Sequence, residues 1–276
     1  HLTSNDIPSV ATRLQNCIEA IQVWCNSRRL QLNPTKTELI WFGSKTNLKK
    51  IADLDLNLYI GPDIIKPVNV VRDLGVYLDS EQSMERHIST VVRACFFHLR
   101  RLKSIRRILG ADVTSGLVSA FVTTRMDYCN SILAALPQSS IDPLQRVQNA
   151  AARLITGTGT RDHITPALRS LHWLPVKFRI TFKLCVLMHL VHIGRAPAYL
   201  SDMVTATADL PSRGRLRSSN TFRYELPIVK RKFGERGFSY AGPKAWNDLP
   251  PALQELTDTC TFKRLLKTHL FTLAYT

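Results

Sequence analysis

RHISTVVRACFFHLRRLKSIRR, residues 86–107, is the stretch that decides the fold of this chain. Ile88, Val92, Cys95, Leu99 and Leu102 follow one another at steps of four and three, which is the spacing of one helix face. Seven cationic residues, here named the basic band, occupy other positions of the same stretch: Arg86, Arg93, Arg100, Arg101, Lys103, Arg106 and Arg107. No acidic residue lies between 86 and 107. The pattern predicts a helix with an apolar seam toward a core and cations toward solvent.

The distribution of charge along the chain points to a polyanionic partner. Residues 1–82 hold nine basic and nine acidic residues, so the whole net charge of +16 belongs to residues 83–276. Such a local excess is typical of a surface that binds phosphates, and nucleic acid is the first candidate. A solvated helix face is the alternative, but solvated faces normally mix both signs of charge. The sequence therefore favours nucleic-acid contact.

The remaining periodicities predict an α+β fold, with a small antiparallel sheet and one helix followed by an almost purely helical region. The first helix is expected over residues 6–29. Short β-prone runs should form the sheet, over 37–42, 56–60, 64–71 and 74–78. Further helices are expected over 111–133, 139–156, 164–171, 175–193 and 258–272. We expect an exposed loop over 205–220, and the residues over 224–229 are compatible with a strand.

Motifs that could carry chemistry have simpler explanations. Gly157-Thr-Gly-Thr160 lacks the Gly-Lys-Ser/Thr ending of a phosphate loop and follows a helical pattern, so it predicts a helix end. Gly237-Phe-Ser-Tyr-Ala-Gly242 has one residue too many for a nucleophile elbow and is interpreted as a turn. Asp53-Leu-Asp55 is interpreted as a loop and not as a magnesium site. The eight histidines show no metal-ligand spacing, so no metal site is predicted.

The cysteines and the hydropathy indicate the cellular compartment expected for the protein. Six cysteines are scattered without any C-x-x-C pair, which favours reduced thiols in an intracellular protein, in the nucleus or the cytoplasm. The most apolar stretch, Leu184–Ile193, is too short to cross a bilayer, so no membrane partner is expected. Binding to an anionic membrane surface is a weaker hypothesis, because no strongly amphipathic terminal helix is present. The first residue is His1 and not methionine, so we expect a piece of a longer protein.

Six segments carry a resemblance to a known family: Trp24–Asn26, Leu30–Glu38, Leu74–Asp79, Gln148–Arg153, Leu171–Val176 and Ala241–Pro250. Together they resemble the reverse transcriptase of non-LTR (LINE-type) retrotransposons, and the likeness covers essentially the whole chain. The resemblance implies that residues 1–82 are the end of the polymerase palm and that residues 83–156 are a basic helical thumb. It leaves residues 157–276 as a mostly helical carboxy-terminal region of unclear role.

The resemblance also implies partners and site residues. The thumb would bind an RNA template and an RNA–DNA duplex. Lys36 would lie near the incoming nucleotide and stabilise the departing pyrophosphate, although a surface lysine at a strand edge is an equal alternative. Leu74, Gly75 and Val76 would form the primer grip, where glycine lets the primer backbone approach closely.

The family's catalytic aspartates have no counterpart in this sequence, which contains no Asp-Asp pair. Two-metal phosphoryl transfer needs carboxylates to hold magnesium, so we expect no cofactor in this chain and no polymerase activity from it alone. Magnesium would act only in the full-length enzyme, together with the upstream palm and fingers. The alternative is a non-enzymatic helical module, derived from a retroelement, that binds nucleic acid or another partner.

Overall fold

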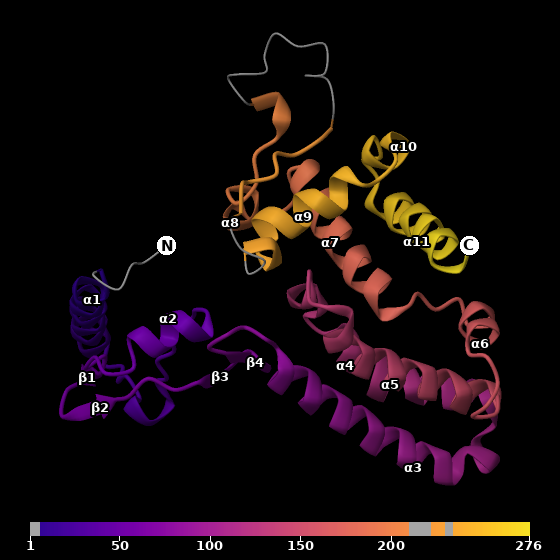
Figure 1. The fold of residues 1–276 in the computed structure, drawn as a ribbon, viewed down its shortest axis with the longest axis horizontal. Coiled ribbons are helices and arrows are strands. Elements are labelled where there is room, and N and C mark those ends of the chain that lie inside the picture. Colours follow the sequence, from indigo (N-terminus) through magenta and orange to yellow (C-terminus); the bar gives the residue numbers. More distant parts are fainter. Residues whose placement is uncertain (1–5, 210–221, 230–233) are drawn as a thin grey trace. The chain divides into compact units, whose positions relative to one another are not determined.

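The structure of the protein is a computed structural model that describes residues 6–209, 222–229 and 234–276 (Figure 1). It divides the chain into two compact units, His1–His87 and Ile88–Thr276. The predicted α+β class is confirmed, since helices predominate and the strands form small antiparallel sheets. The boundary expected near residue 156 lies inside the second unit.

The first unit consists of one long helix, two short helical turns and four short strands. In chain order these are α1 (Ile7–Ser27), η1 (Pro34–Lys36), α2 (Lys45–Lys50), β1 (Leu58–Ile60), β2 (Asp63–Ile65), β3 (Val70–Asp73) and β4 (Val76–Asp79). Leu58, Ile60 and Ile65 form its small core, against which Ile18 of α1 and Leu39 pack. The Gln15 side chain of α1 also holds the edge of β1, since it accepts from Tyr59 N and donates to Tyr59 O.

The predicted single sheet is wrong, because the strands form two separate two-stranded antiparallel sheets, β1–β2 and β3–β4. The run expected over 64–71 is interrupted at Pro67, which has no amide hydrogen to donate to a ladder. The run expected over 37–42 makes only an isolated parallel bridge between Leu39 and Pro67. Leu74 and Gly75 form the β3–β4 turn with φ of 44° and 87°, as a tight hairpin requires, so the last strand begins at Val76.

The second unit is helical. Its elements are α3 (Glu85–Val118), a π-helical turn (Ser119–Thr123), α4 (Thr124–Asp127), η3 (Asn130–Leu133), α5 (Gln138–Thr156), α6 (Thr165–Ser170), α7 (Val176–His192), α8 (Ala198–Ser201), η4 (Thr207–Asp209), η6 (Gly234–Arg236), α9 (Phe238–Asn247), α10 (Pro251–Gln254) and α11 (Thr259–Tyr275). The helices expected from periodicity are present, although α3 is kinked at Gly110 and the stretch over 111–133 is not one continuous helix.

One hydrophobic core of this unit lies where α7, α9 and α11 meet. Trp246, Phe262, Leu266 and Met188 are fully buried there. The Trp246 Nε1–H donates to Phe222 O at 2.7 Å, and Asn247 exchanges two side-chain hydrogen bonds with the backbone of Tyr224. This core therefore combines apolar packing with hydrogen-bonded indole and amide groups.

Two local predictions in this unit need correction. The segment 237–242, expected to be a turn, forms the N-cap and first half of α9. Its Gly242 serves helix packing, since an added Cβ would lie 2.9 Å from the Met188 sulfur. The strand allowed over 224–229 is reduced to one bridge between Tyr224 and Ala206.

The loop interpretation of residues 157–160 is confirmed, because Gly157 ends α5 with φ of 73°. Of the expected loop over 205–220, residues 207–209 form the turn η4, and residues 210–220 lie outside the described residues. No helix in the described part of the chain is long and apolar enough to span a bilayer.

Candidate nucleic-acid interface

The apolar seam of α3 faces the core as predicted, with Val92 half-buried and the other four members buried. Ile88, Cys95, Leu99 and Leu102 are each no more than 6% exposed. Because these residues recur along one face, they fix the rotation of the helix about its own axis. The opposite face must then point to solvent.

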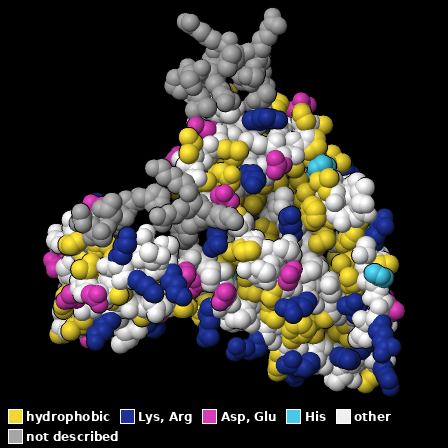
Figure 2. All heavy atoms as spheres, in the orientation of Figure 1, with side chains coloured by type: hydrophobic (Ala, Val, Ile, Leu, Met, Phe, Trp, Pro, Cys, Tyr) yellow, Lys and Arg dark blue, Asp and Glu magenta, His cyan; other side chains and the backbone are white. Residues whose placement is uncertain are grey.

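The basic band lies on the solvent side of α3 with one exception. Arg86, Arg93, Arg100, Arg101, Lys103 and Arg107 are all exposed. Figure 2 shows Lys and Arg side chains concentrated in the lower part of the second unit, where α3 runs in Figure 1. The prediction that these cations face outward is confirmed by their exposure.

Arg106 is the exception within the basic band. Its Nε and Nη2 groups donate to Leu154 O at 2.9 Å and to Ile155 O at 3.0 Å, the carbonyls of the last turn of α5. Arg106 follows Leu102 by four residues, so it shares the buried face of α3 and not the solvent face. A guanidinium at a helix C-terminus satisfies unpaired carbonyls and complements the helix dipole. The predicted phosphate contact is therefore replaced by a structural one.

Three aromatic rings in contact with one another lie near these cations, and we call Phe97, His98 and Phe121 the aromatic row. Phe97 and His98 meet edge to face with ring centroids 5.4 Å apart, and His98 stacks on Phe121 at 5.2 Å. The Arg101 guanidinium lies 5.6 Å from the centre of the Phe97 ring. Phe97 is 48% exposed and Phe121 is 41% exposed. The row therefore presents aromatic surface to solvent.

Charge and burial both act on His98 in this row. Desolvation lowers the pKa of His98, and the nearby charges of Arg125 and Arg101 lower the pKa further. The ring is therefore mostly neutral at pH 7. A neutral imidazole stacks as an uncharged aromatic ring.

Sequence reasoning did not identify the aromatic row, although half of its signal is present in the sequence. Phe97 lies four residues after Arg93 and four residues before Arg101, which places it on the same outward face. Phe121 could not be assigned in this way, because it reaches His98 from the π-helical turn that follows α3.

The candidate polymerase residues lie in the first unit. Lys36 is exposed at the end of η1, a turn that the Asn33 side chain caps by accepting from Thr35 N at 3.0 Å. Of the primer-grip candidates, Leu74 is 83% exposed at the tip of the hairpin, Gly75 completes the turn, and Val76 is buried.

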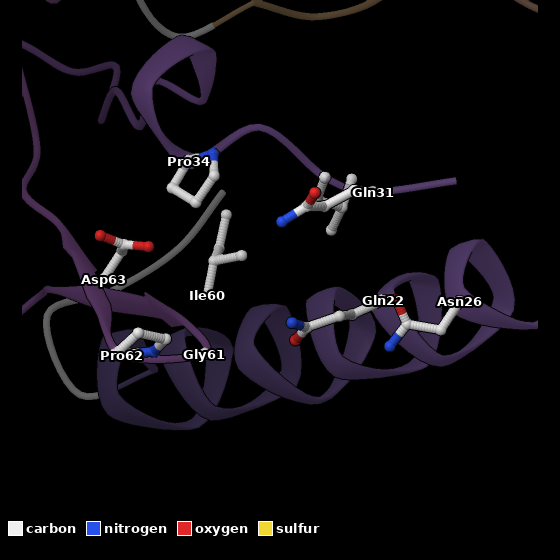
Figure 3. Close-up of a pocket in the computed structure, with 9 residues that line it drawn as sticks. Gln22, Asn26, Gln31, Pro34, Ile60, Gly61, Pro62 and Asp63 are labelled. Carbon is white, nitrogen blue, oxygen red and sulfur yellow. The ribbon is translucent and has the colours of Figure 1, made fainter. Parts of the chain in front are cut away.

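A small cavity of about 280 Å³ opens beside η1 (Figure 3). It is lined by Gln22, Asn26, Gln31, Leu32, Pro34, Ile60, Gly61, Pro62 and Asp63. The lining offers amides and one carboxylate but not Lys36. The cavity can therefore form hydrogen bonds, and it does not bring the predicted lysine together with a binding pocket.

Asp53 and Asp55 lie in the turn and loop that follow α2, as predicted for that segment. Asp55 accepts a hydrogen bond from Asn57 N at 3.2 Å, which is a local turn contact. Within the described residues, no group of three or more His, Cys, Asp or Glu side chains could hold a metal ion.

A lysine cluster on α2 was concealed by the neutral charge of residues 1–82. Lys45, Lys49 and Lys50 lie with Thr46 around one surface hollow. Residues 1–82 contain as many acidic as basic residues, so their net charge does not reveal this cluster. Only the helix brings them to one surface.

The segments that carry the family resemblance in the second unit take part in packing. Gln148 donates to Leu174 O at 2.8 Å, and Gln145 accepts from Val176 N at 2.9 Å, so the segments 148–153 and 171–176 are tied together. Trp246 is fully buried in the core formed by α7, α9 and α11. These residues therefore contribute to the packing of the unit.

Comparisons with known proteins gave no match to any protein-family model, curated protein or solved structure. A functional assignment therefore depends on the resemblance in the sequence and on the geometry of the candidate interface.

Proposed function

We propose that this chain is the carboxy-terminal part of a retrotransposon-type reverse transcriptase and that the outward face of α3 binds template–primer nucleic acid. One observation carries the proposal. Six cations are exposed along a helix whose opposite face is buried, and no acidic residue interrupts them. A surface of one charge sign, held rigidly by its own helix, suits a chain of phosphates.

The spacing of the arginines supports this proposal. Arg86, Arg93, Arg100 and Arg107 recur every seven residues, so successive side chains start about 10 Å apart along the helix axis. Arginine offers a planar fork that pairs with two phosphate oxygens, and its charge does not depend on pH in the physiological range. The row of guanidinium groups would therefore follow a sugar–phosphate strand without reading its sequence.

The other parts of the proposed enzyme follow from the family resemblance. Lys36 would stabilise the leaving pyrophosphate, and Leu74, Gly75 and Val76 would contact the primer. The residues present lack the Asp-Asp pair of the family. Magnesium and bond formation would therefore depend on the catalytic aspartates of the upstream palm, and this chain would contribute binding of the RNA template and the RNA–DNA duplex.

The test is binding of a fluorescein-labelled RNA–DNA duplex over a series of salt concentrations. We expect the logarithm of the association constant to fall linearly with the logarithm of salt concentration. The triple variant Arg93→Gln, Arg100→Gln and Arg107→Gln should flatten that slope by about 0.9 for each lost phosphate contact.

The matched control removes the same number of charges from exposed positions of the first unit, by Arg13→Gln, Arg28→Gln and Lys66→Gln. It should keep most of the slope. Equal slopes for the two triple variants would show that net charge alone drives binding and would overturn the assignment to α3. Absence of salt-dependent binding by the unmodified chain would overturn the proposed function itself.

A further inference from the structure

Phosphate binding does not explain the exposed ring of Phe97 on α3. Phe97 lies on the face opposite the apolar seam, where arginines would be enough to hold phosphates. An isolated surface phenylalanine is common. Here, however, the ring continues into His98 and Phe121 to form the aromatic row.

The cations around Phe97 are placed to flank a ligand stacked on the ring. Arg93 and Arg101 lie one helical turn before and after Phe97, and Arg100 lies three residues after it. The Arg101 guanidinium already lies against the ring, at 5.6 Å from its centre. A flat, uncharged, aromatic ligand with negative charge on both sides would fit this arrangement, and a nucleotide within a strand has that chemistry.

The backbone next to the row is also unusual. Ser119–Thr123 is a π-helical turn, and it presents Phe121 to His98. Such turns occur often at functional sites. The Thr124 N–H donates to Ser119 O across the widened turn, and the Thr124 hydroxyl donates to Ser119 O and Ala120 O. Phe121 therefore enters the row from this hydrogen-bonded turn.

We infer that the aromatic row is a stacking platform for an unpaired nucleobase, with Arg93, Arg100 and Arg101 contacting the phosphates on either side of that base. This inference rests on the proposed function, since it requires nucleic acid on α3, and it adds that the bound strand is single at this point. Bases stack on aromatic side chains and on guanidinium planes, and such stacking tolerates any sequence because every base has a π face. The ligand class is single-stranded nucleic acid or the unpaired overhang of a duplex.

The experiment compares two single strands with the same phosphates. One is an oligothymidine strand, and the other is a strand of equal length whose residues are abasic. The unmodified chain should bind the thymidine strand more tightly. Phe97→Ala should weaken binding of the thymidine strand about 5- to 150-fold, which corresponds to the loss of one stacked base. Its binding of the abasic strand should stay within about twofold, because the arginines remain.

Two further variants separate stacking from general apolar contact. Phe97→Tyr keeps an aromatic ring and should retain the preference for the thymidine strand. Ile108→Ala removes an 84% exposed apolar side chain from the same helix outside the row and should leave both affinities unchanged. A 2-aminopurine base in the strand gives a second measurement, because stacking on Phe97 quenches its fluorescence.

The outcomes distinguish this inference from the function on which it rests. Salt-dependent binding that is equal for both strands, and unaffected by Phe97→Ala, would overturn the stacking platform and leave phosphate binding intact. An equal loss for Phe97→Ala and Ile108→Ala would also overturn it. Absence of salt-dependent binding to either strand would overturn both proposals.

Discussion

Two stacked histidine–phenylalanine pairs in the second unit have the same chemistry and different surroundings. His98 stacks on Phe121 at 5.2 Å, at the surface and among arginines. His189 stacks on Phe262 at 4.1 Å, with neither side chain exposed. The comparison teaches that ring pairing alone does not identify a binding site. Exposure and the neighbouring charges decide whether a pair contributes to stability or remains available for a ligand.

The neighbours of the buried pair show its structural role. His189 Nε2 lies 3.2 Å from the Thr259 hydroxyl at the start of α11, while Trp246 lies against both rings of the pair. The pair therefore joins α7 to α11 directly, and Trp246 of α9 packs against both rings. We call His189, Phe262 and Trp246 the inner group, and the aromatic row is the outer group.

The largest effect should come from the centre of the inner group. Trp246→Ala removes a fully buried ring and the donor to Phe222 O, so it should lower the free energy of unfolding by about 3–5 kcal/mol. Urea denaturation followed by circular dichroism measures this change. A loss below about 1 kcal/mol would mean that the inner group does not hold the unit together.

Substitutions of the two adjacent arginines at the end of the basic band should have different effects, one on stability and the other on binding. Arg106→Ala leaves the carbonyls of Leu154 and Ile155 without their donors and should lower the free energy of unfolding by about 1–3 kcal/mol. Arg107→Ala, at an exposed position, should change stability by less than about 0.5 kcal/mol and weaken duplex binding. Equal stabilities of the two variants would contradict the assigned role of Arg106.

Glycine substitutions should act in opposite directions at inner and outer positions. Gly242→Ala places a methyl group 2.9 Å from the Met188 sulfur and from the Phe238 ring, so it should destabilise the protein by about 1–3 kcal/mol. Gly116→Ala, on α3, meets no heavy atom within 4 Å and should stabilise the helix by about 0.5–1 kcal/mol. Thermal unfolding of both variants checks the signs, and destabilisation by both would contradict this account.

Acidification should lower the free energy of unfolding through His189 of the inner group. Burial lowers the pKa of His189, and the charge of His192 lowers the pKa further, so the folded protein takes up a proton on this ring at lower pH than the unfolded chain, in which histidine titrates at about pH 6.5. The unfolded state then binds more protons, and stability falls as pH falls below that value. His189→Gln should flatten this dependence between pH 7 and pH 5, measured by urea midpoints. An unchanged slope for His189→Gln would contradict the prediction.

The smallest effect on stability should come from the outer group. Phe97→Ala should change the free energy of unfolding by less than about 0.5 kcal/mol, because the ring is nearly half exposed. The same denaturation experiment that tests Trp246→Ala measures it. A loss comparable with that of the tryptophan variant would show that the aromatic row is part of the core.

Local periodicity was enough to predict most helices and the rotation of α3. The seam from Ile88 to Leu102 and the outward arginines follow from residues within one helix, as do the helices over 139–156 and 175–193. The strands were less predictable, because a run such as 64–71 becomes a strand only where a partner accepts its hydrogen bonds. Pro67 and the tight turn at Leu74-Gly75 divided the expected sheet into two hairpins.

The sequence by itself determined which face of α3 carries charge, since helix geometry links residues three, four and seven positions apart. Only the tertiary structure showed that Arg106 caps α5, that Phe121 extends the rings of Phe97 and His98, and that Gly242 belongs to a packed helix. The physical reason is that these features are contacts between segments distant in the chain. Their formation depends on how whole helices pack, and no spacing within one segment encodes that packing.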